Sequence, residues 1–237
     1  MKLAIMQPYF FPYIGYWQLI NAVDRFILFD DVQYIRHGWI NRNRVLKNGG
    51  GWKYVTIPVK RQGREMKIKD VLIAESADVS KIVLNSLIPY KKMAPFYKET
   101  ISFVSEALST VSDRHISTIN EATIKLTASY LGIRTQIDVS SKLNLDYSQV
   151  KGPGDWAFEI SKQIGAEEYI NPVGGRELFD KQKFASANIK LQFIKPRDMV
   201  YQQDGLKFEP WLSIIDVLMF NGREKTISML NEYEITE

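Results

Sequence analysis

Cysteine is absent from this 237-residue sequence, and its absence excludes disulfides, thiol nucleophiles and metal sites built on cysteine. Histidine is almost as scarce: only His37 and His115 occur, so a multi-histidine metal site is not expected. The sequence also lacks an apolar run of about 18 residues that could span a bilayer, and its proline-containing start does not have the form of a signal peptide. These absences predict a cytoplasmic protein without a transmembrane segment or a metal centre.

Positive charge is unevenly distributed. Between Arg36 and Lys69 the sequence has ten Lys or Arg residues and one acidic residue, Glu65, which gives this segment +9. Because the whole chain carries +4, the rest carries −5. A basic lobe on an acidic body indicates an anionic small-molecule ligand, although lysines that protect the edge of a hairpin give the same pattern. No recognised nucleic-acid motif accompanies the charge, so nucleic acid is not expected as a partner.

The first thirty-one residues have a strand–helix–strand pattern. Lys2–Met6 and Arg25–Phe29 are apolar runs of strand length, and Ile14–Ala22 has the apolar spacing of one helix face. Two prolines keep Gln7–Tyr13 from being helical throughout. This pattern predicts a parallel βαβ unit. Since ligands of open α/β sheets bind outside the carboxyl ends of the strands, a site is expected at Gln7–Tyr13 and Asp30-Asp31.

The α/β pattern stops after residue 31 and resumes near residue 132. In between, Trp52–Val59 and Met66–Ile73 are predicted to pair as a hairpin, and residues 78–131 have helical spacing. The later part of the chain has three predicted strands and three predicted helices. The strands are Thr135–Val139, Glu168–Ile170 and Ile189–Ile194, and the helices are Asp155–Ile164, most of Gly175–Asn188, and Leu212–Phe220.

The predicted fold class is therefore α/β. We expect a Rossmann-like parallel sheet of about five strands with helices on both faces, an inserted β-hairpin and a helical cap. The first strand is expected to lie beside Thr135–Val139 at the switch point of the sheet. The predicted division is a discontinuous Rossmann-like domain (1–31 and 132–200), a basic hairpin lobe (32–75), a helical cap (76–131) and a C-terminal helical segment (201–237).

Several polar residues follow predicted strands, and each has a functional and a structural interpretation. The amide of Gln7 could hold an anion or a sugar hydroxyl, or tie the proline-rich turn. Asp30 and Asp31 could position a ribose, bind Mg²⁺ or accept a proton from an amine, or belong to a local turn. His37 could transfer a proton near neutral pH, although a lone histidine is more often structural or exposed.

Other residues are candidates for binding rings and phosphates. Tyr9 and Tyr13 could stack on a base or a sugar ring, or belong to the core. Arg42 and Arg44 flank Asn43 in a segment without apolar period, and arginine is suited to bidentate phosphate contacts. The glycines of Gly174-Gly175-Arg176 lie between a strand and a helix, where backbone amides can bind a phosphate; the alternative is a plain tight turn.

Two long motifs resemble the opening of the WbqC-like protein family, which is found in bacterial gene clusters for O-antigen and other surface polysaccharides. They are QPYFFPYIGYWQLI from Gln7 and DDVQYIRHGWINRNRV from Asp30. Further matches are WKYVTIPV from Trp52, NPVGGREL from Asn171 and FEPWLSIIDVL from Phe208, so the resemblance covers essentially the whole chain. In many members a histidine precedes the glutamine, whereas this chain has Met6, which puts a general acid/base role at that position in doubt.

The motifs of the two commonest nucleotide-binding loops, GxGxxG and GxxxxGK[ST], are both absent. The predicted sheet nevertheless resembles that of the adenylate-forming superfamily with the HIGH motif, which includes pantothenate synthetase. That resemblance implies that Gln7–Phe10 and Gly15 pack under a nucleotide and that Ser140 and Ser141 contact phosphates.

The family resemblance implies a role in surface polysaccharide synthesis. Our first hypothesis is an enzyme that joins an aminoacyl group, with glycine as the first choice, or another acyl group to the amine of a nucleotide-linked amino sugar, through an acyl adenylate made from ATP with Mg²⁺. The alternatives are a glycosyltransferase and a non-catalytic sugar-nucleotide-binding module. The acyl donor, the acceptor sugar and the oligomeric state stay open. The candidate catalytic residues are Gln7, Asp30 and His37, and the candidate binding residues are Tyr9, Tyr13, Gly15, Asp31, Arg42, Asn43, Arg44, Ser140, Ser141, Gly174, Gly175 and Arg176.

Overall fold

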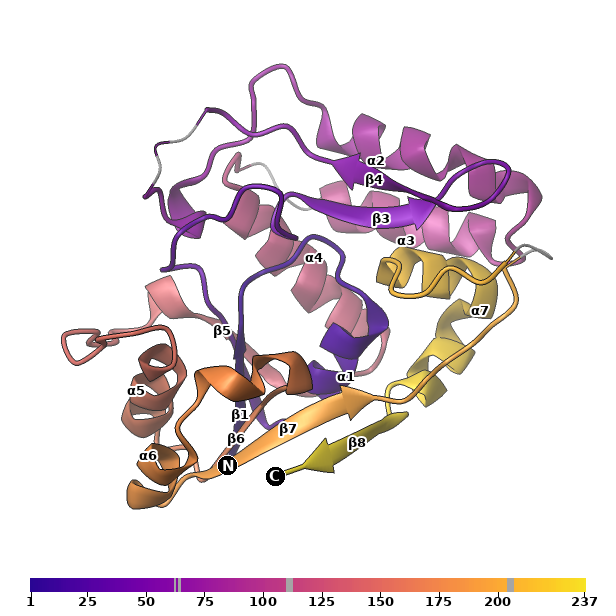
Figure 1. Ribbon diagram of the computed structural model, residues 1–237. Coiled ribbons are helices and arrows are strands. Elements are labelled where there is room, and N and C mark those ends of the chain that lie inside the picture. Colours follow the sequence, from indigo (N-terminus) through magenta and orange to yellow (C-terminus); the bar gives the residue numbers. More distant parts are fainter. Residues whose placement is uncertain (62, 64, 110–112, 204–206) are drawn as a thin grey trace.

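The computed structural model describes residues 1–61, 63, 65–109, 113–203 and 207–237. A six-stranded sheet forms its lower part in the view of Figure 1, in the order β5-β2-β1-β6-β7-β8. Five neighbouring strands run parallel, and β8 pairs antiparallel with β7 at the edge. The strands are β1 (Lys2–Met6), β2 (Arg25–Leu28), β5 (Gln136–Val139), β6 (Glu168–Pro172), β7 (Lys190–Pro196) and β8 (Tyr233–Thr236).

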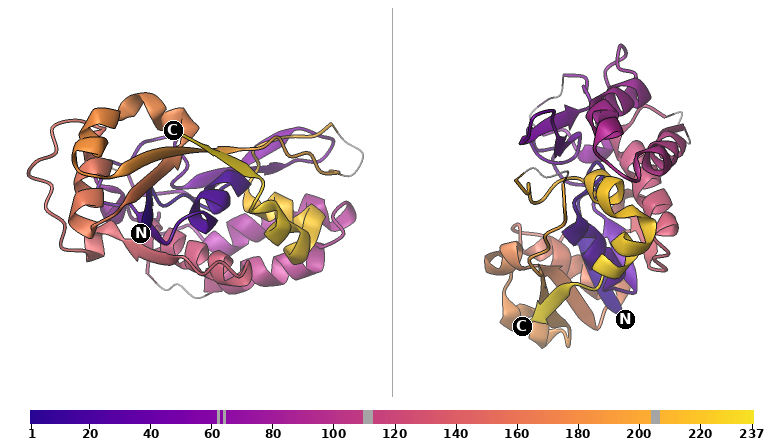
Figure 2. Two further views of the ribbon diagram at one scale, coloured as in Figure 1. Left: turned by 90° about the horizontal axis from the view of Figure 1, so that it is seen from below. Right: turned by 90° about the vertical axis from the view of Figure 1, so that its right-hand side faces the viewer.

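Helices cover both faces of the sheet, as predicted (Figures 1 and 2). The central strand β1 shows why, since Leu3, Ala4 and Ile5 are all buried and a strand covered on both sides needs apolar residues on both. Ala4 packs in a cluster with α1, α4 and α7, whereas Leu3 and Ile5 pack in a second cluster with α5 and α6. These helices are α1 (Ile14–Asn21), α4 (Ile116–Tyr130), α5 (Asp155–Ile164), α6 (Lys181–Ser186) and α7 (Ile214–Met229).

The α/β fold class and the five parallel strands are confirmed, but the predicted switch point was wrong. Strand β5 pairs with β2, with Arg25 opposite Gln136, so β5 is not a neighbour of β1. The neighbour of β1 on its other side is β6. The reason lies in the path of the chain. From β1 the sheet first grows in one direction, through β2 to β5. Helix α5, on the opposite face, then leads the chain back past β2 and β1, so that β6 pairs on the other side of β1. The prediction also missed β8.

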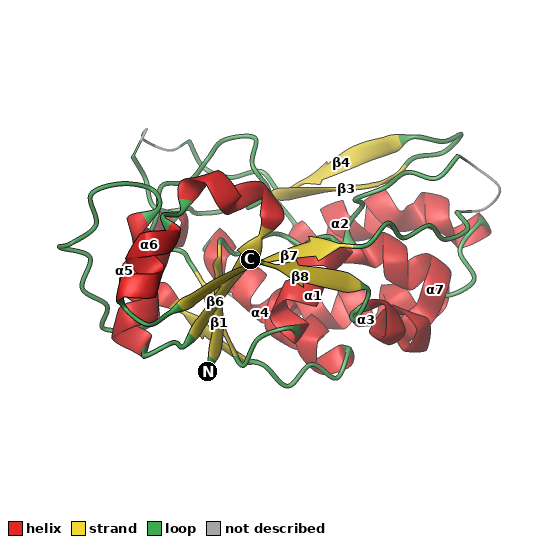
Figure 3. Ribbon diagram, turned by 60° about the horizontal axis from the view of Figure 1, so that its bottom comes forward, coloured by secondary structure: helices red, strands yellow, loops and turns green. Residues whose placement is uncertain are grey.

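The inserted hairpin exists, but its strands differ from the predicted pair. Strand β3 (Arg42–Leu46) pairs antiparallel with β4 (Trp52–Thr56), and this ribbon stands apart from the main sheet (Figure 3). The predicted return strand Met66–Ile73 was wrong, because that segment holds a short 3₁₀-helix, η1 (Ile68–Asp70), and forms only isolated bridges, of which one, from Ile73, reaches Val59. Strand β3 escaped prediction because its inward position 43 is a buried asparagine, which breaks the apolar alternation.

The region predicted to be helical contains α2 (Val79–Leu87), a 3₁₀-helix η2 (Ile88–Lys92), α3 (Tyr97–Ser109) and α4. Residues 173–186 form a 3₁₀-helix, η4 (Val173–Leu178), followed by the short α6, and another 3₁₀-helix, η3 (Ser140–Lys142), follows β5. The hairpin, the helices α2, α3 and α4, and one face of the sheet contribute to the same hydrophobic cluster. The division into four domains and segments stays a prediction. Within the described ranges, no helix combines the length and apolar character required to cross a membrane.

Candidate functional site

The loop between β1 and α1, residues 7–13, follows a carboxyl end of the sheet, and side chains from elsewhere in the chain hold it in place. Buried carbonyl groups need hydrogen-bond partners, and this loop finds them on α1, α4, β3 and the residue before α7. The amide of Asn43 donates to two consecutive carbonyls, those of Phe10 and Phe11, at 2.9 Å each. The other contacts run from Tyr16 Oη to Gln7 O (2.9 Å), Asn120 Nδ2 to Pro8 O (2.7 Å), Ser213 Oγ to Phe11 O (2.7 Å) and Trp17 Nε1 to Pro12 O (3.0 Å).

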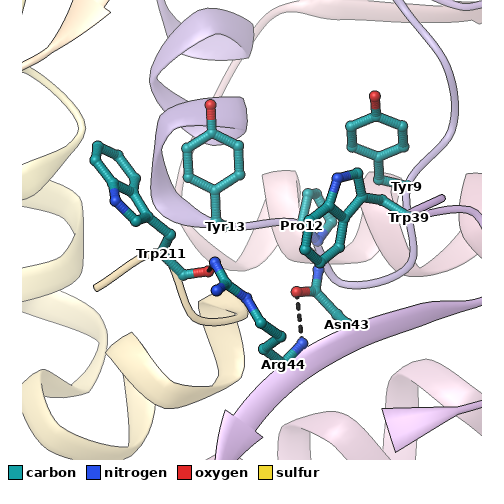
Figure 4. Close-up of a pocket in the computed structure, with 7 residues that line it drawn as sticks. All are labelled: Tyr9, Pro12, Tyr13, Trp39, Asn43, Arg44 and Trp211. Carbon is teal, nitrogen blue, oxygen red and sulfur yellow. Dashed lines mark hydrogen bonds between the residues drawn. The ribbon is translucent and has the colours of Figure 1, made fainter. Parts of the chain in front are cut away.

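An open pocket of about 200 Å³ lies on one side of this loop (Figure 4). We call it the aromatic pocket. Its walls are mostly rings, and Tyr13 and Trp211 meet nearly at right angles, with centroids 5.8 Å apart. Small-molecule sites are commonly apolar with a few placed polar groups, and the lining of this pocket has that character. The lining residues are Tyr9, Pro12, Tyr13, Trp39, Asn43, Arg44 and Trp211.

Arg44 supplies the charge of the aromatic pocket. Its Nη2 donates to the carbonyl oxygen of Trp211 at 2.9 Å, and its guanidinium lies 5.4 Å from the ring centroid of Trp39 and 5.1 Å from that of Trp52. Such stacking positions a guanidinium without using its N–H groups. The Nε of Arg44 is buried and has no hydrogen-bond partner in the described part of the chain. A fixed cation with unused donors is suited to an anionic ligand.

The two tyrosines of the aromatic pocket are hydroxyl donors at neutral pH. Burial raises the pKa of both Tyr9 and Tyr13 above the usual value of a phenol, because a low-dielectric environment disfavours the phenolate. The phenols therefore offer O–H groups and ring faces to a ligand rather than a base.

A second pocket, of about 160 Å³, lies at the carboxyl ends of β2 and β5 on the other side of the opening loop, where Pro8 lines it. We call it the polar pocket. Lysines and carboxylates alternate around it, and most are already paired: Lys69 contacts Asp31 at 2.8 Å, and Lys142 contacts Glu121 at 2.7 Å. Its residues are Pro8, Leu28, Asp30, Lys69, His115, Ser117, Thr118, Glu121, Val139, Ser141 and Lys142.

Asp30 is the best-connected carboxylate of the polar pocket. It is 2% exposed, and its oxygens accept hydrogen bonds from Ser140 Oγ (2.9 Å), Ser141 N (3.0 Å) and Ser141 Oγ (2.7 Å). The backbone N–H of Asp30 also donates to Ser140 Oγ at 3.1 Å. These contacts join the end of β2 to the end of β5 and occupy most of the carboxylate's accepting capacity. Three predicted site residues, Asp30, Ser140 and Ser141, are thus in direct contact, whereas the catalytic role of Asp30 stays a prediction.

His115 enters the polar pocket with a carboxylate partner that the sequence did not reveal. Its Nδ1 lies 2.8 Å from Asp113 Oδ1, and the hydroxyl of Thr118 donates to the other oxygen of Asp113 at 2.8 Å. Burial alone raises the pKa of the Asp113 carboxyl, but the hydrogen bonds from His115 and Thr118 outweigh it and lower the pKa to about 2. An ionised carboxylate on Nδ1 favours the tautomer whose Nε2 can accept a proton.

The other predicted residues lie outside these two pockets. His37 is exposed in a turn with φ 63, and its carbonyl accepts a hydrogen bond from Arg42. Gly15 is needed for packing, since a Cβ there would lie 2.4 Å from the Tyr13 ring. Gln7 and Asp31 do not line either pocket.

The loop after β6 lies elsewhere on the same edge. Arg176 extends to β8, where its Nη2 donates to Thr236 Oγ1 at 2.6 Å and its guanidinium lies over the Phe193 ring. Gly175 avoids the amide of Asn171, which a Cβ would approach to 2.4 Å, whereas Gly174 faces open space. The phosphate-binding role predicted for this loop stays a prediction. Among the described residues, no group of three or more His, Asp and Glu side chains is arranged to hold a metal ion.

The site therefore contains several residues that sequence reasoning did not select. Trp39 and Trp211 line the aromatic pocket, and both lie inside motifs that carry the family resemblance, so a closer examination of those motifs could have found them. Lys69, His115, Glu121 and Lys142 are scattered over the chain and meet only through the fold. No local sequence signal marks them.

Comparisons with known proteins agree with the resemblance in the sequence. The WbqC-like protein family matches residues 7–228. A protein of Mycobacterium tuberculosis (strain ATCC 25618 / H37Rv) described as "Uncharacterized protein Rv1507c" is 31% identical over 227 residues, which are 94% of this chain and 95% of that protein. No solved structure matches the chain.

Proposed function

Because the chain belongs to the WbqC-like protein family, we propose that it is an enzyme of surface polysaccharide synthesis. Its substrate is a nucleotide-linked amino sugar, and it transfers an aminoacyl or other acyl group to the sugar's amine. The observation that carries the proposal is the aromatic pocket. It brings four predicted binding residues together with two tryptophans. The predicted residues are Tyr9, Tyr13, Asn43 and Arg44, and the tryptophans are Trp39 and Trp211. Aromatic rings bind the apolar face of a sugar, and a stacked guanidinium pairs with a phosphate.

In this proposal the polar pocket takes the acyl donor and the ATP that activates it. The donor's carboxylate attacks the α-phosphorus of ATP and releases pyrophosphate. The sugar's amine then attacks the acyl carbon, AMP leaves, and the nitrogen gives up a proton. The contacts favour His115 as the acceptor of that proton, because it lines the polar pocket and Asp113 orients its imidazole. His37 lines neither pocket, and the carboxylate of Asp30 already accepts three hydrogen bonds from Ser140 and Ser141.

A non-catalytic sugar-nucleotide-binding module is the second candidate. It is favoured by the state of Asp30, whose carboxylate is already occupied by three hydrogen bonds. Such a module would use the aromatic pocket in the same way and leave the polar pocket without chemistry. The two candidates therefore agree on ligand binding and differ on turnover.

The first prediction concerns the ligand. We expect nucleoside-diphosphate sugars to raise the melting temperature of the protein more than the free amino sugars do, because only the former can pair with Arg44 and the basic segment. Differential scanning fluorimetry with matched pairs of free and nucleotide-linked sugars measures this. The Arg44→Ala variant is the control, since it removes the guanidinium that pairs with the diphosphate and should reduce the difference. Equal shifts for both ligand classes would contradict the proposal.

The second prediction concerns activation. If an acyl adenylate forms, the protein should catalyse glycine-dependent exchange of labelled pyrophosphate into ATP. A panel of other amino acids and small carboxylic acids extends the assay beyond glycine. Exchange with none of them, from protein whose folding has been verified by circular dichroism, would leave the binding module as the better candidate.

A further inference from the structure

The outward face of the β3–β4 hairpin has a group of aromatic and arginine side chains that continues beyond the aromatic pocket. In the register of the hairpin, Arg44 lies opposite Tyr54, and residues two apart along a strand share a face, so Arg42 and Trp52 project from this face as well. Trp52 and Tyr54 are 38% and 39% exposed. We call the group of Trp39, Arg42, Arg44, Trp52 and Tyr54 the hairpin platform.

The arginines of the hairpin platform are stacked on its rings. The guanidinium of Arg42 lies 4.0 Å from the centroid of Tyr54, and that of Arg44 lies 5.1 Å from the centroid of Trp52. Arg42 donates through Nε and Nη2 to the carbonyls of Gly38 and His37. In the described part of the chain, the Nη1 groups of both arginines have no hydrogen-bond partner. Two ordered cations with unused N–H edges, next to exposed rings, suit a ligand that combines a phosphate with an aromatic ring.

Arg44 belongs to both the hairpin platform and the aromatic pocket. A ligand that extends from the pocket onto the platform must therefore pass its guanidinium. The order of features is pocket, then cation, then exposed rings, and the order of groups in a nucleotide sugar is sugar, then diphosphate, then nucleoside. The two orders match.

We propose that the hairpin platform binds the nucleoside diphosphate end of the substrate. The base stacks against Trp52 and Tyr54, the diphosphate contacts Arg42 and Arg44, and the sugar lies in the aromatic pocket. This assignment rests on the proposed function and adds the orientation of the substrate. It also explains why the basic segment has aromatic side chains on its outward face. If its lysines only protected the edge of the hairpin from pairing with other strands, these rings would not be needed.

Isothermal titration of nucleoside diphosphates and of pyrophosphate tests the assignment. The probes are the diphosphates of uridine, guanosine, cytidine and thymidine. For the one that the wild type binds best, the Trp52→Ala/Tyr54→Ala double variant should bind about tenfold more weakly or worse, the scale of one lost base–aromatic stacking contact. Pyrophosphate has no base, so its affinity should fall much less than that of the nucleotide, even though the two arginines lose the rings on which they stack. Both side chains are partly exposed, and circular dichroism checks that the hairpin still folds.

Two matched variants control the experiment. Trp52→Phe/Tyr54→Phe keeps a ring at both positions and should retain the affinity. Lys53→Ala removes a charge from the opposite face of the same strand and should leave base stacking unchanged. If pyrophosphate binding falls as much as nucleotide binding in the double alanine variant, the rings only hold the arginines in position and do not stack on a base. The assignment is then overturned.

The remaining outcomes separate the assignment from the proposed function. If wild type and double alanine variant bind nucleoside diphosphates and nucleotide sugars equally well, the platform assignment fails while the proposed function stands. If the wild type binds neither, both fail. A six-nucleotide single-stranded RNA that binds more tightly than every nucleoside diphosphate, and loses its affinity in the double alanine variant, would overturn the assignment in favour of nucleic acid.

Discussion

Replacing Phe11 by alanine should lower the free energy of unfolding by roughly 3–5 kcal/mol, the usual cost of truncating a buried phenylalanine. Phe11 is 1% exposed and packs edge-to-face on Phe10, with centroids 5.1 Å apart. Its carbonyl is also an anchor of the opening loop, since it accepts hydrogen bonds from Asn43 and Ser213. Chemical denaturation at neutral pH measures the loss.

The backbone of Phe11 allows a sharper test. Its φ is 40, in the left-handed region where a side chain is strained and glycine is not. At an ordinary position alanine is more stable than glycine, but here Phe11→Gly should be at least as stable as Phe11→Ala, since it relieves strain while losing the same ring. If Phe11→Gly is the less stable of the two by about 1 kcal/mol, the strained conformation is not maintained in solution.

Gln7→Ala is the matched control in the same loop. The Gln7 side chain is only partly buried, and its backbone carbonyl, which the substitution retains, accepts the hydrogen bond from Tyr16. A change of no more than about 1 kcal/mol is therefore expected. Together the three variants separate a loop held by its backbone from a loop held by the glutamine amide.

The sheet could be predicted from sequence because its strands are short apolar runs between turn signals. Leu3 to Ile5 and Phe26 to Leu28 are buried without interruption, which is the pattern of parallel strands covered on both faces. Strand order could not be predicted in the same way. It depends on which face of the sheet each crossover covers, and the helices α2, α3 and α4 between β2 and β5 give no indication of that.

Strand β3 shows where pattern reasoning fails. Asn43 points inward, where an apolar residue is expected, because its amide satisfies two carbonyls of the opening loop. A residue selected for hydrogen bonds to a distant segment has no periodic signal. The same property made Asn43 look like a ligand-binding residue, and the structure gives it a structural task in addition to its place in the aromatic pocket.

The candidate site was partly predictable for a similar reason. Tyr9, Tyr13, Asn43 and Arg44 were selected because they lie in polar-aromatic segments without a structural period, and the structure brings them together. The aromatic partners of the arginines were not predicted as such, since cation–π stacking across a hairpin needs the register of β3 with β4. In the polar pocket Asp30 and Ser141 were predicted, but the residues that η1 and α4 contribute from other parts of the chain were not.

Asp30→Ala should lower the free energy of unfolding by about 3 kcal/mol, because it removes the acceptor of one buried and two partly buried hydrogen bonds and leaves their donors unpaired. Those donors are the hydroxyls of Ser140 and Ser141 and the backbone N–H of Ser141. Ser141→Ala removes one of the three bonds and retains the others, so its cost should be about 1 kcal/mol. Denaturation curves of both variants at neutral pH give the comparison.

The same variant decides between a structural and a catalytic Asp30. If the carboxylate mainly joins the ends of β2 and β5, then at a temperature where Asp30→Ala is still folded, nucleotide-sugar binding per folded molecule should equal that of the wild type. Pyrophosphate exchange per folded molecule should also persist, because the proposed formation of the adenylate has no step in which Asp30 takes part. The opposite pattern, a variant of wild-type stability with no binding or no exchange, would show that the serine contacts contribute little and that Asp30 acts directly on the substrate. Asp30→Asn separates the two further, since it keeps one acceptor oxygen and should recover part of the stability but none of a base's function.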